Sequence, residues 1–185
     1  MQATDILMSE HRVIERVLAA LETAAKRLEQ GHAVRPGFFV DAADFIKGFA
    51  DGCHHRKEEG VLFKAMVAGG MPSEGGPINV MLSEHELGRA YTRAMREAAL
   101  KLEAGDPLAR SAVVFDACSY VDLLRQHIAK EDSVLFPLAS RVIRAAAQDK
   151  VTEDFERVEH EETGEGVHEK YLALAEKLEK EMAES

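Results

Sequence analysis

The sequence predicts an all-α protein, and three observations support this fold class. Ala, Leu, Glu, Lys, Arg and Met, which favour helices most strongly, fill its long segments. Apolar residues recur in those segments at helical spacing. Trp is absent and only 3 Tyr occur, which argues against a sheet built on aromatic cross-strand pairs. A chain of 185 residues is long enough to bury a substantial core within one domain.

The first two long helices are expected on either side of a short turn. The first covers residues 5–30, with Thr4 as its N-cap and Gly31 just beyond its end. The second begins at Pro36 and continues to about residue 68. Residues 69–77 are dense in Gly and Pro and are therefore expected to form a loop.

Two more long helices complete the predicted bundle. The third covers residues 78–103, and the fourth starts with Asp106 as its N-cap and Pro107 at its first position. Pro137 should kink or interrupt this helix, which then resumes through residue 147. Four long helices joined by short turns predict an up-down-up-down four-helix bundle over residues 1–147.

A C-terminal extension of residues 148–185 is expected to pack on this bundle. Thr152 should cap a brief helix that ends near residue 162, and Gly164 and Gly166 should break it. A last amphipathic helix is expected over residues 167–183, with an apolar stripe suited to docking.

Composition excludes several classes of protein. The formal net charge of −10 disfavours nucleic acid and anionic membranes as partners, because binding to phosphates requires a basic patch. No apolar run approaches the roughly 18–20 residues of a membrane span, and no signal segment is expected at the N-terminus. The 2 cysteines are too few and too far apart for a disulfide framework. We therefore expect a reduced, cytoplasmic protein, either a monomer or a weak dimer.

A polar motif occurs twice along the chain. Ser9–His11 in the first helix is repeated as Ser83–His85 in the third, and His54–Phe63 in the second helix matches His127–Phe136 in the fourth. The offset is 74 residues for the first pair and 73 for the second. The chain thus resembles two helical hairpins, each with Glu-His on its first helix and His-x-x-Lys-Glu-x-x-Val-Leu-Phe on its second.

These repeated polar residues are predicted to point into the core. Residues four apart share a helix face, so His54 lies above Glu58, and His127 above Glu131, on faces that continue with apolar residues. A buried carboxylate costs several kcal/mol unless it is compensated, and no Lys or Arg lies on those stripes. A metal ion would compensate it, because His with bridging Glu is the ligand set of dinuclear iron or manganese sites in bundles.

The full pattern resembles the hemerythrin-like domains, the cation-binding domains of the His-His-Glu type. That family carries one His on the first helix, His-x-x-x-Glu on the second, one His on the third, and His-x-x-x-Glu or His-x-x-x-x-Asp on the fourth. The resemblance covers about residues 5–140. It implies a site for two iron ions, with manganese or a mixed pair as alternatives, bridged by an oxo or hydroxo group. The residues that fill the pattern are His11, His54, Glu58, His85, His127 and Glu131.

The second helix offers two registers, because His55 and Glu59 have the same spacing as His54 and Glu58. Alignment with the fourth helix favours His54 and Glu58, since the same Leu-Phe pair follows Glu58 and Glu131. We therefore expect His55 and Glu59 to lie outside the ligand set, either behind the ligands or in solvent.

One ligand of the pattern has no obvious counterpart in the third helix. The oxygen-carrying members of the family have His-x-x-x-His there, whereas this chain has Arg89 at the second position, and a protonated guanidinium cannot ligate iron. His168 of the extension is predicted as the residue that completes the site, with His160 and Glu15 as alternatives. A fully exposed His168 remains an open alternative.

The resemblance implies a protein that binds a small molecule at a pair of iron ions. Dioxygen, peroxide and nitric oxide are the expected ligands, in sensing, iron handling or the response to oxidative or nitrosative stress. An enzyme that decomposes peroxide or supports repair of iron–sulfur centres is the alternative, and a purely structural helical protein is a third.

Overall fold

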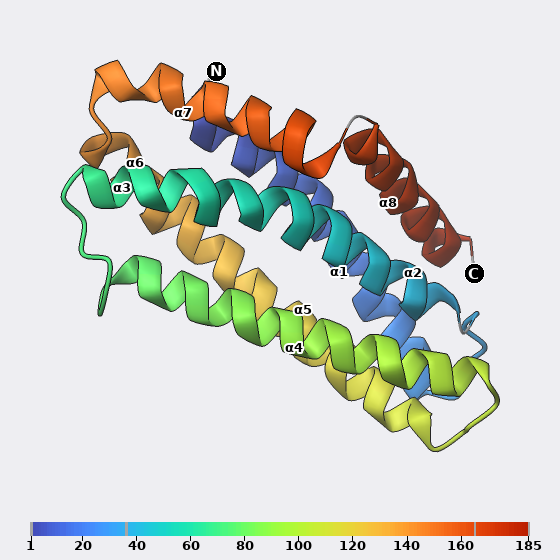
Figure 1. Cartoon of the computed structure of the whole chain (residues 1–185). Coiled ribbons are helices and arrows are strands. Elements are labelled where there is room, and N and C mark those ends of the chain that lie inside the picture. Colours follow the sequence, from blue (N-terminus) through green and yellow to red (C-terminus); the bar gives the residue numbers. More distant parts are fainter. Residues whose placement is uncertain (1, 36, 165, 185) are drawn as a thin grey trace.

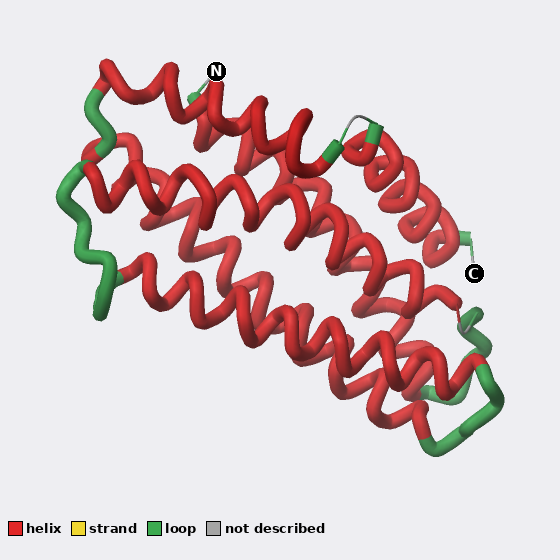
Figure 2. The backbone as a smooth tube through the Cα atoms, viewed as in Figure 1, coloured by secondary structure: helices red, strands yellow, loops and turns green. Residues whose placement is uncertain are grey.

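The computed structural model describes residues 2–35, 37–164 and 166–184, with the backbone alone described at residue 162. It confirms the all-α fold class, and no strand occurs in the described ranges (Figure 2). Four segments are π-helical, meaning that their turns are wider than those of an α-helix. The elements are α1 (Ala3–Glu29), α2 (Gly37–Phe45), π-helical η1 (Ile46–His55), π-helical η2 (Glu58–Leu62), α3 (Phe63–Ala68), α4 (Pro77–Glu103), α5 (Ala109–Lys130), π-helical η3 (Glu131–Leu135), α6 (Phe136–Val142), α7 (Ala145–Arg157), π-helical η4 (Val158–Thr163) and α8 (Val167–Ala183).

These elements build a four-helix bundle. Residues 37–68 form one continuous rod, which we call the second bundle helix, and residues 109–142 form another, the fourth bundle helix. With α1 and α4 they run lengthwise beside one another, and their connections lie at alternate ends (Figure 1). The chain therefore passes up, down, up and down through the bundle, as the short predicted turns required.

Two helix starts differ from the sequence-based expectation, and a third cannot be compared. α1 begins at Ala3, and the backbone N–H of Gln2 donates to the Asp5 carboxylate (2.9 Å), so Thr4 lies inside the helix and is not its N-cap. The fourth bundle helix begins at Ala109, because Asp106 closes a turn by accepting from the N–H of Leu108 (3.0 Å). Pro36, predicted to open the second helix, lies outside the described residues.

The region around Pro137 also differs. The helix is not interrupted there, because η3 widens the turn just before the proline and gives its ring room against the preceding carbonyls. The helix ends at Val142 rather than at residue 147, because the backbone of the next residue, Ile143, is extended. α7 then begins at Ala145, so Thr152 is no cap. Its hydroxyl donates to the carbonyl of Gln148 inside the helix (3.3 Å).

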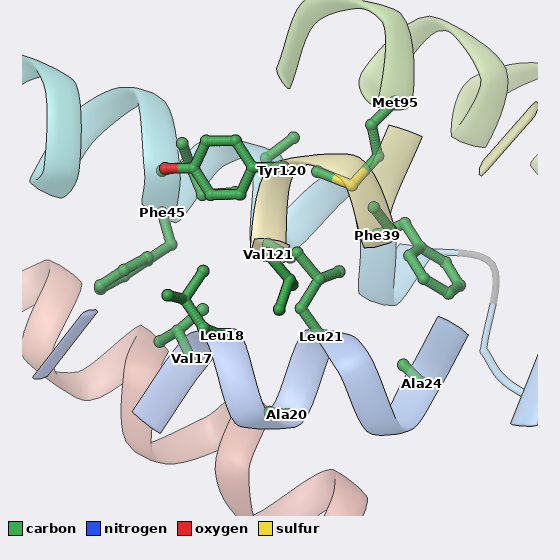
Figure 3. Packing of buried hydrophobic residues seen from close by; sticks show 14 of the residues in the cluster. Val17, Leu18, Ala20, Leu21, Ala24, Phe39, Phe45, Met95, Tyr120 and Val121 are labelled. Atoms are coloured by element: carbon green, nitrogen blue, oxygen red, sulfur yellow. The ribbon is translucent and has the colours of Figure 1, made fainter. Parts of the chain in front are cut away.

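Apolar residues form two clusters along the bundle. The larger one surrounds Leu18 and Leu21 of α1, which face Val121 and Tyr120 of α5 (Figure 3). The smaller one surrounds Leu7, Phe63 and Phe155. On each bundle helix the predicted ligands lie between residues of one cluster and residues of the other, so a polar layer crosses an otherwise apolar core.

The C-terminal helices lie along one side of the bundle. α7 contacts α1 and η2, η4 contacts η1, and α8 contacts α1 and α2. Figure 1 shows α7 and α8 in sequence along this side. Tyr171 of α8 packs onto the backbone of Gly48, where an added Cβ would lie only 1.9 Å from its ring. None of the helices in the described ranges is both long enough and apolar enough to cross a membrane.

Candidate metal centre

Seven side chains that can ligate metal meet in the polar layer, and none is more than 5% exposed. We call these seven the central layer. Their ligand atoms form two groups, and within each group all lie within 4.8 Å of one another. The first group contains His11, His54, Glu58 and Glu131, and the second contains His55, Glu58, His85 and His127.

The two carboxylates lie between the groups. Glu58 presents Oε1 to Nε2 of His54 (3.5 Å) and Oε2 to Nε2 of His85 (3.4 Å). Glu131 presents Oε2 to Nε2 of His11 (3.2 Å) and Oε1 to Nε2 of His127 (3.2 Å). Each carboxylate therefore turns one oxygen toward the histidines on either side, which is the orientation of a bridging ligand.

The oxygens of these two carboxylates are unpaired. Both oxygens of Glu58 and both of Glu131 are buried without a hydrogen-bond partner in the described residues, as is Nε2 of His11 and of His54. Buried polar atoms are nearly always paired, because an unpaired one costs free energy. Imidazole nitrogens and carboxylate oxygens that converge in this way fit a pair of divalent metal ions.

Protons compensate part of the charge when no metal is bound. Burial, together with the charge of Glu131, raises the pKa of Glu58 well above its usual value, so Glu58 keeps its proton. Burial opposes the ionisation of Glu131, but the neighbouring imidazoles of His11 and His127 lower its pKa. Burial also disfavours the charge on His11, but the hydrogen bond with Asp132 and the nearby carboxylate of Glu131 raise its pKa to about 9. Metal binding would therefore release protons.

The outer nitrogens of four histidines each contact a carboxylate on a neighbouring helix. The Nδ1–H donates in each pair, because an ionised carboxylate only accepts. Together the pairs form a closed ring, in which every bundle helix supplies a carboxylate to the next one. The links are Glu10 of α1 to His54 (2.9 Å), Glu59 of the second bundle helix to His85 (2.7 Å), Glu84 of α4 to His127 (2.9 Å) and Asp132 of the fourth bundle helix to His11 (2.7 Å).

A cation lies behind each of these outer carboxylates. The pairs are Lys57 with Glu10 (2.5 Å), Arg89 with Glu59 (2.8 Å), Lys130 with Glu84, and Arg12 with Asp132. Such carboxylates fix the tautomer and orientation of a metal-ligating histidine and increase its basicity.

Replacing an outer carboxylate should therefore weaken metal binding without removing a ligand. We expect Asp132→Asn to lower metal affinity about 10–100-fold, because His11 loses its fixed orientation and part of its basicity. Titration with a competing chelator measures this change. Glu86→Gln is the matched control, because that carboxylate is 69% exposed and pairs with Arg89. An affinity equal to that of the wild type in Asp132→Asn would contradict the role of the ring.

Comparison with known proteins agrees with this geometry. Residues 2–139 match the model of the hemerythrin HHE cation-binding domain. The chain belongs to this family. The matched residues include the four bundle helices except for the last three residues of the fourth, and α7, η4 and α8 lie beyond them.

Curated relatives of this hemerythrin-like protein are distant. The uncharacterized protein Rv1995 of Mycobacterium tuberculosis is 28% identical over 163 residues, covering 88% of this chain and 63% of the relative. The uncharacterized protein Mb2018 of Mycobacterium bovis matches to the same extent. The iron-sulfur cluster repair protein YtfE of Dickeya chrysanthemi is 28% identical over 128 residues, covering 67% of this chain and 58% of the relative. The chain thus spans less than two thirds of the length of these relatives, and no solved structure matches it.

The structure brings six of the seven predicted ligands together. His11, His54, Glu58, His85, His127 and Glu131 all lie in the central layer. The seventh, His168, does not reach it. Its Nδ1 lies 3.5 Å from Glu159 and 4.0 Å from Sγ of Cys53, in a separate group on the side covered by the C-terminal helices. The other candidates also lie elsewhere, since Glu15 pairs with Arg12 and His160 is exposed.

His55, which the sequence led us to expect outside the ligand set, lies in the central layer. It is buried among His85, His127 and Glu58, and its ring stacks on that of His85 at 3.8 Å between centroids. The presence of His54 in the central layer therefore does not exclude His55, because one histidine belongs to each group. Glu58 belongs to one group with His54 and to the other group with His55, so all three side chains face the central layer.

Arg89 occupies the position on α4 where the oxygen-carrying members of the family have a second histidine. It contacts the carboxylates that face the histidines. It pairs with Asp51 (2.6 Å) and with Glu59 (2.8 Å), the carboxylates nearest to Nδ1 of His55 and of His85. The nitrogen ligand that α4 does not supply is thus offered by His55 of the second bundle helix.

A cavity of about 200 Å³ reaches the second group from the outside. His55 and His85 line it, together with Arg89, Gly88 and Tyr120. Tyr120 is 1% exposed, and its hydroxyl has no hydrogen-bond partner among the described residues. A small molecule in this cavity would therefore lie beside the histidines and beside an available hydrogen-bond donor.

Proposed function

We propose that the protein binds two iron ions in its central layer and interacts there with dioxygen, peroxide or nitric oxide. The unpaired oxygens of Glu58 and Glu131 carry this proposal, because each carboxylate turns one oxygen toward each group of histidines. Membership in the cation-binding family supports it independently.

The choice of metal follows from the ligand types. Imidazole and carboxylate suit iron, and carboxylate also suits manganese, whereas thiolate would favour zinc or copper(I). A manganese or mixed-metal pair is compatible with the same ligands. A bound iron pair would supply the redox chemistry toward the small ligand. His54 and His55 remain neutral, because burial is the main cause that lowers the pKa of both, so their nitrogens are available as ligands.

Metal analysis and optical spectroscopy test this function directly. The protein, purified without added metal, should contain about two equivalents of iron. After reduction with dithionite and removal of the reductant, air should change the spectrum, and the spectrum of the reduced protein should return when the oxygen is removed. Near-zero metal content after incubation with ferrous iron under argon would contradict the proposal, and the polar layer would then be only structural.

An enzymatic role is the second candidate. It is favoured by the similarity to YtfE, which is named an iron-sulfur cluster repair protein, although this chain spans only 58% of that relative. The iron-loaded protein should then restore the activity of an enzyme with a damaged iron–sulfur centre, or consume peroxide over many turnovers. Stable adducts without turnover in either assay would favour binding or sensing instead.

Tyr120 should affect the bound small molecule and leave the metal in place. We expect Tyr120→Phe to shorten the lifetime of the ligand adduct at least several-fold, because the hydroxyl in the cavity is lost as a hydrogen-bond donor. Metal content should stay that of the wild type, and the metal-free variant should be equally stable or more stable by about 1 kcal/mol, since a buried unpaired hydroxyl is removed. Stopped-flow spectroscopy and thermal unfolding measure these quantities. An unchanged adduct would show that the ligand binds elsewhere.

The remaining expectations about partners also belong to this proposal. We infer that residues 1–147 bind the small ligand, that residues 148–185 serve as an extension, and that the protein works in the cytoplasm as a monomer or weak dimer. The net charge of −10 supports a small-molecule partner rather than nucleic acid or an anionic membrane. Gel filtration with light scattering measures the oligomeric state.

A further inference from the structure

Lys57 of the second bundle helix is fully buried, and it joins the C-terminal helices to the central layer. Its ammonium lies 2.5 Å from Oε1 of Glu10 and 2.7 Å from Oε2 of Glu159, which belongs to η4. The other oxygen of Glu10 accepts from Nδ1 of His54 (2.9 Å). A continuous chain of contacts thus runs from Glu159 through Lys57 and Glu10 to His54.

The other half of the internal repeat provides a natural comparison. Lys130 pairs with Glu84, and Glu84 accepts from His127 (2.9 Å), as Lys57 and Glu10 do for His54. The side chain of Lys130, however, is 42% exposed, whereas that of Lys57 is 0% exposed. Glu159, which contacts Lys57, lies beyond residues 2–139 that match the family. In the described ranges, Lys130 has no such contact with a carboxylate from the C-terminal helices.

The neighbours of Glu159 show why a cation is needed here. Glu10, Cys53, Glu159 and His168 lie close enough to hold a metal ion. The Lys57 ammonium already contacts both carboxylates of this cluster and supplies the positive charge. We therefore interpret the cluster as a contact between η4, α8 and the bundle in which one lysine bridges two carboxylates, and not as a third metal site.

We propose that Glu159 is a positioning residue for the metal centre, through which the docked C-terminal helices tune the ion held by His11 and His54. This inference rests on the metal-binding part of the proposed function. Glu159 shares the charge of Lys57 with Glu10. When Glu159 is present, Lys57 polarises Glu10 less, and Glu10 remains a strong acceptor for His54. A strong acceptor increases the basicity of a metal-ligating histidine.

The sign of the effect follows from this chain of contacts. In Glu159→Gln, the whole charge of Lys57 acts on Glu10, and Glu10 becomes a weaker acceptor for the Nδ1–H of His54. His54 then donates less electron density to the iron, so the higher oxidation state of the iron loses stabilisation. The midpoint potential of the centre should rise, and metal in the first group should be released faster. In Lys57→Met, Glu10 is no longer polarised, so the potential should fall. Opposite signs distinguish this mechanism from a general loosening of the fold.

The experiment uses the full chain loaded with iron. Release of iron to a chelator should have two phases, one for each group. We expect Glu159→Gln to accelerate one phase about three- to tenfold, to leave the other unchanged, and to raise the midpoint potential by up to about 59 mV, the value of a tenfold change in a one-electron equilibrium. Glu161→Gln is the matched control, because Glu161 is exposed in the same η4 segment.

A double-variant cycle tests whether Glu159 acts through Lys57. Adding Glu159→Gln to Lys57→Met should cause no further change in release or potential, because the contact is already broken. If Lys57→Met does not fold, Glu10→Gln breaks the same chain one step nearer to His54.

The outcomes separate the two proposals. A wild type that binds no metal contradicts the proposed function. A wild type that binds two ions, with a Glu159→Gln variant that melts at a lower temperature but keeps the wild-type potential and release, shows that the C-terminal helices only stabilise the fold. Equal acceleration of both phases would also overturn the inference, because Glu159 would then lack selectivity for the first group.

Discussion

Replacing Glu58 with glutamine should leave the protein unable to hold either metal ion. Glu58 is the residue that belongs to both groups of ligands, and its two oxygens face His54 and His85. A neutral amide with the same shape cannot bridge two cations. We therefore expect the metal content to fall from about two equivalents to near zero, while the helical content stays that of the wild type.

The same substitution should make the metal-free protein more stable. The pKa of Glu58 is raised in the folded state, so the metal-free wild type loses stability as the pH rises above the ordinary pKa of a glutamate. Glu58→Gln lacks this loss, and its free energy of unfolding at neutral pH should exceed that of the metal-free wild type by about 1–3 kcal/mol.

Metal analysis, together with thermal unfolding at several pH values, measures both effects. Glu15→Gln is the control, because Glu15 lies one turn after His11 but is 40% exposed and pairs with Arg12. A Glu58→Gln variant that retains one full equivalent would show that Glu131 and the histidines suffice for one site. In that case the bridging role assigned to Glu58 would be wrong.

The second large effect is expected at His55. His55→Ala should remove about one of the two metal equivalents, because the second group loses one of its three histidines. His54→Ala should remove the other equivalent, since the first group then retains only His11 as a nitrogen ligand. The double variant should hold little or no metal.

Spectroscopy can assign each loss to its group, and His32→Ala is a suitable control because His32 is exposed in the turn after α1. If His55→Ala keeps the full metal content, His55 lies outside the ligand set, as the sequence led us to expect. Loss of both equivalents from either single variant would instead indicate that the two ions bind cooperatively.

The sequence predicted the fold class and six residues of the central layer, because both depend on periodicity. Apolar residues at helical spacing determine which face of each helix is buried, and the repeat places His and Glu at the same point on alternate helices. Where a helix ends depends on local contacts that periodicity does not record, as Thr152 and Pro137 illustrate.

The positions of His55 and His168 depend on tertiary packing, which helical spacing does not predict. His55 was excluded because the second helix was compared with the fourth, whose corresponding residue is Ile128, buried in the apolar core. The repeat is therefore asymmetric at this position. His168 was predicted to enter the site because it begins an amphipathic helix, but helical spacing does not specify where that helix docks.

The ring of outer carboxylates also escaped notice, although the repeat contains its signal. Glu10 and Glu84 each precede a predicted ligand, Lys57 and Lys130 each follow one by three residues, and Glu59 matches Asp132. Recurrence of these charges beside the ligands at the same offset was the available indication. The repeat does not show that each carboxylate contacts the histidine of the neighbouring helix rather than the histidine of its own helix.

That ring also specifies how the helices align along their axes. Small apolar residues such as Ala20, Ala24 and Ala117 fill much of the core, and such surfaces can slide past one another at little cost. Sliding one helix by a turn, about 5.4 Å, would break its links to both neighbours in the ring. Two hydrogen bonds between a histidine and a carboxylate would be lost at once. The polar layer therefore selects a single axial alignment of the bundle during folding, before any metal binds.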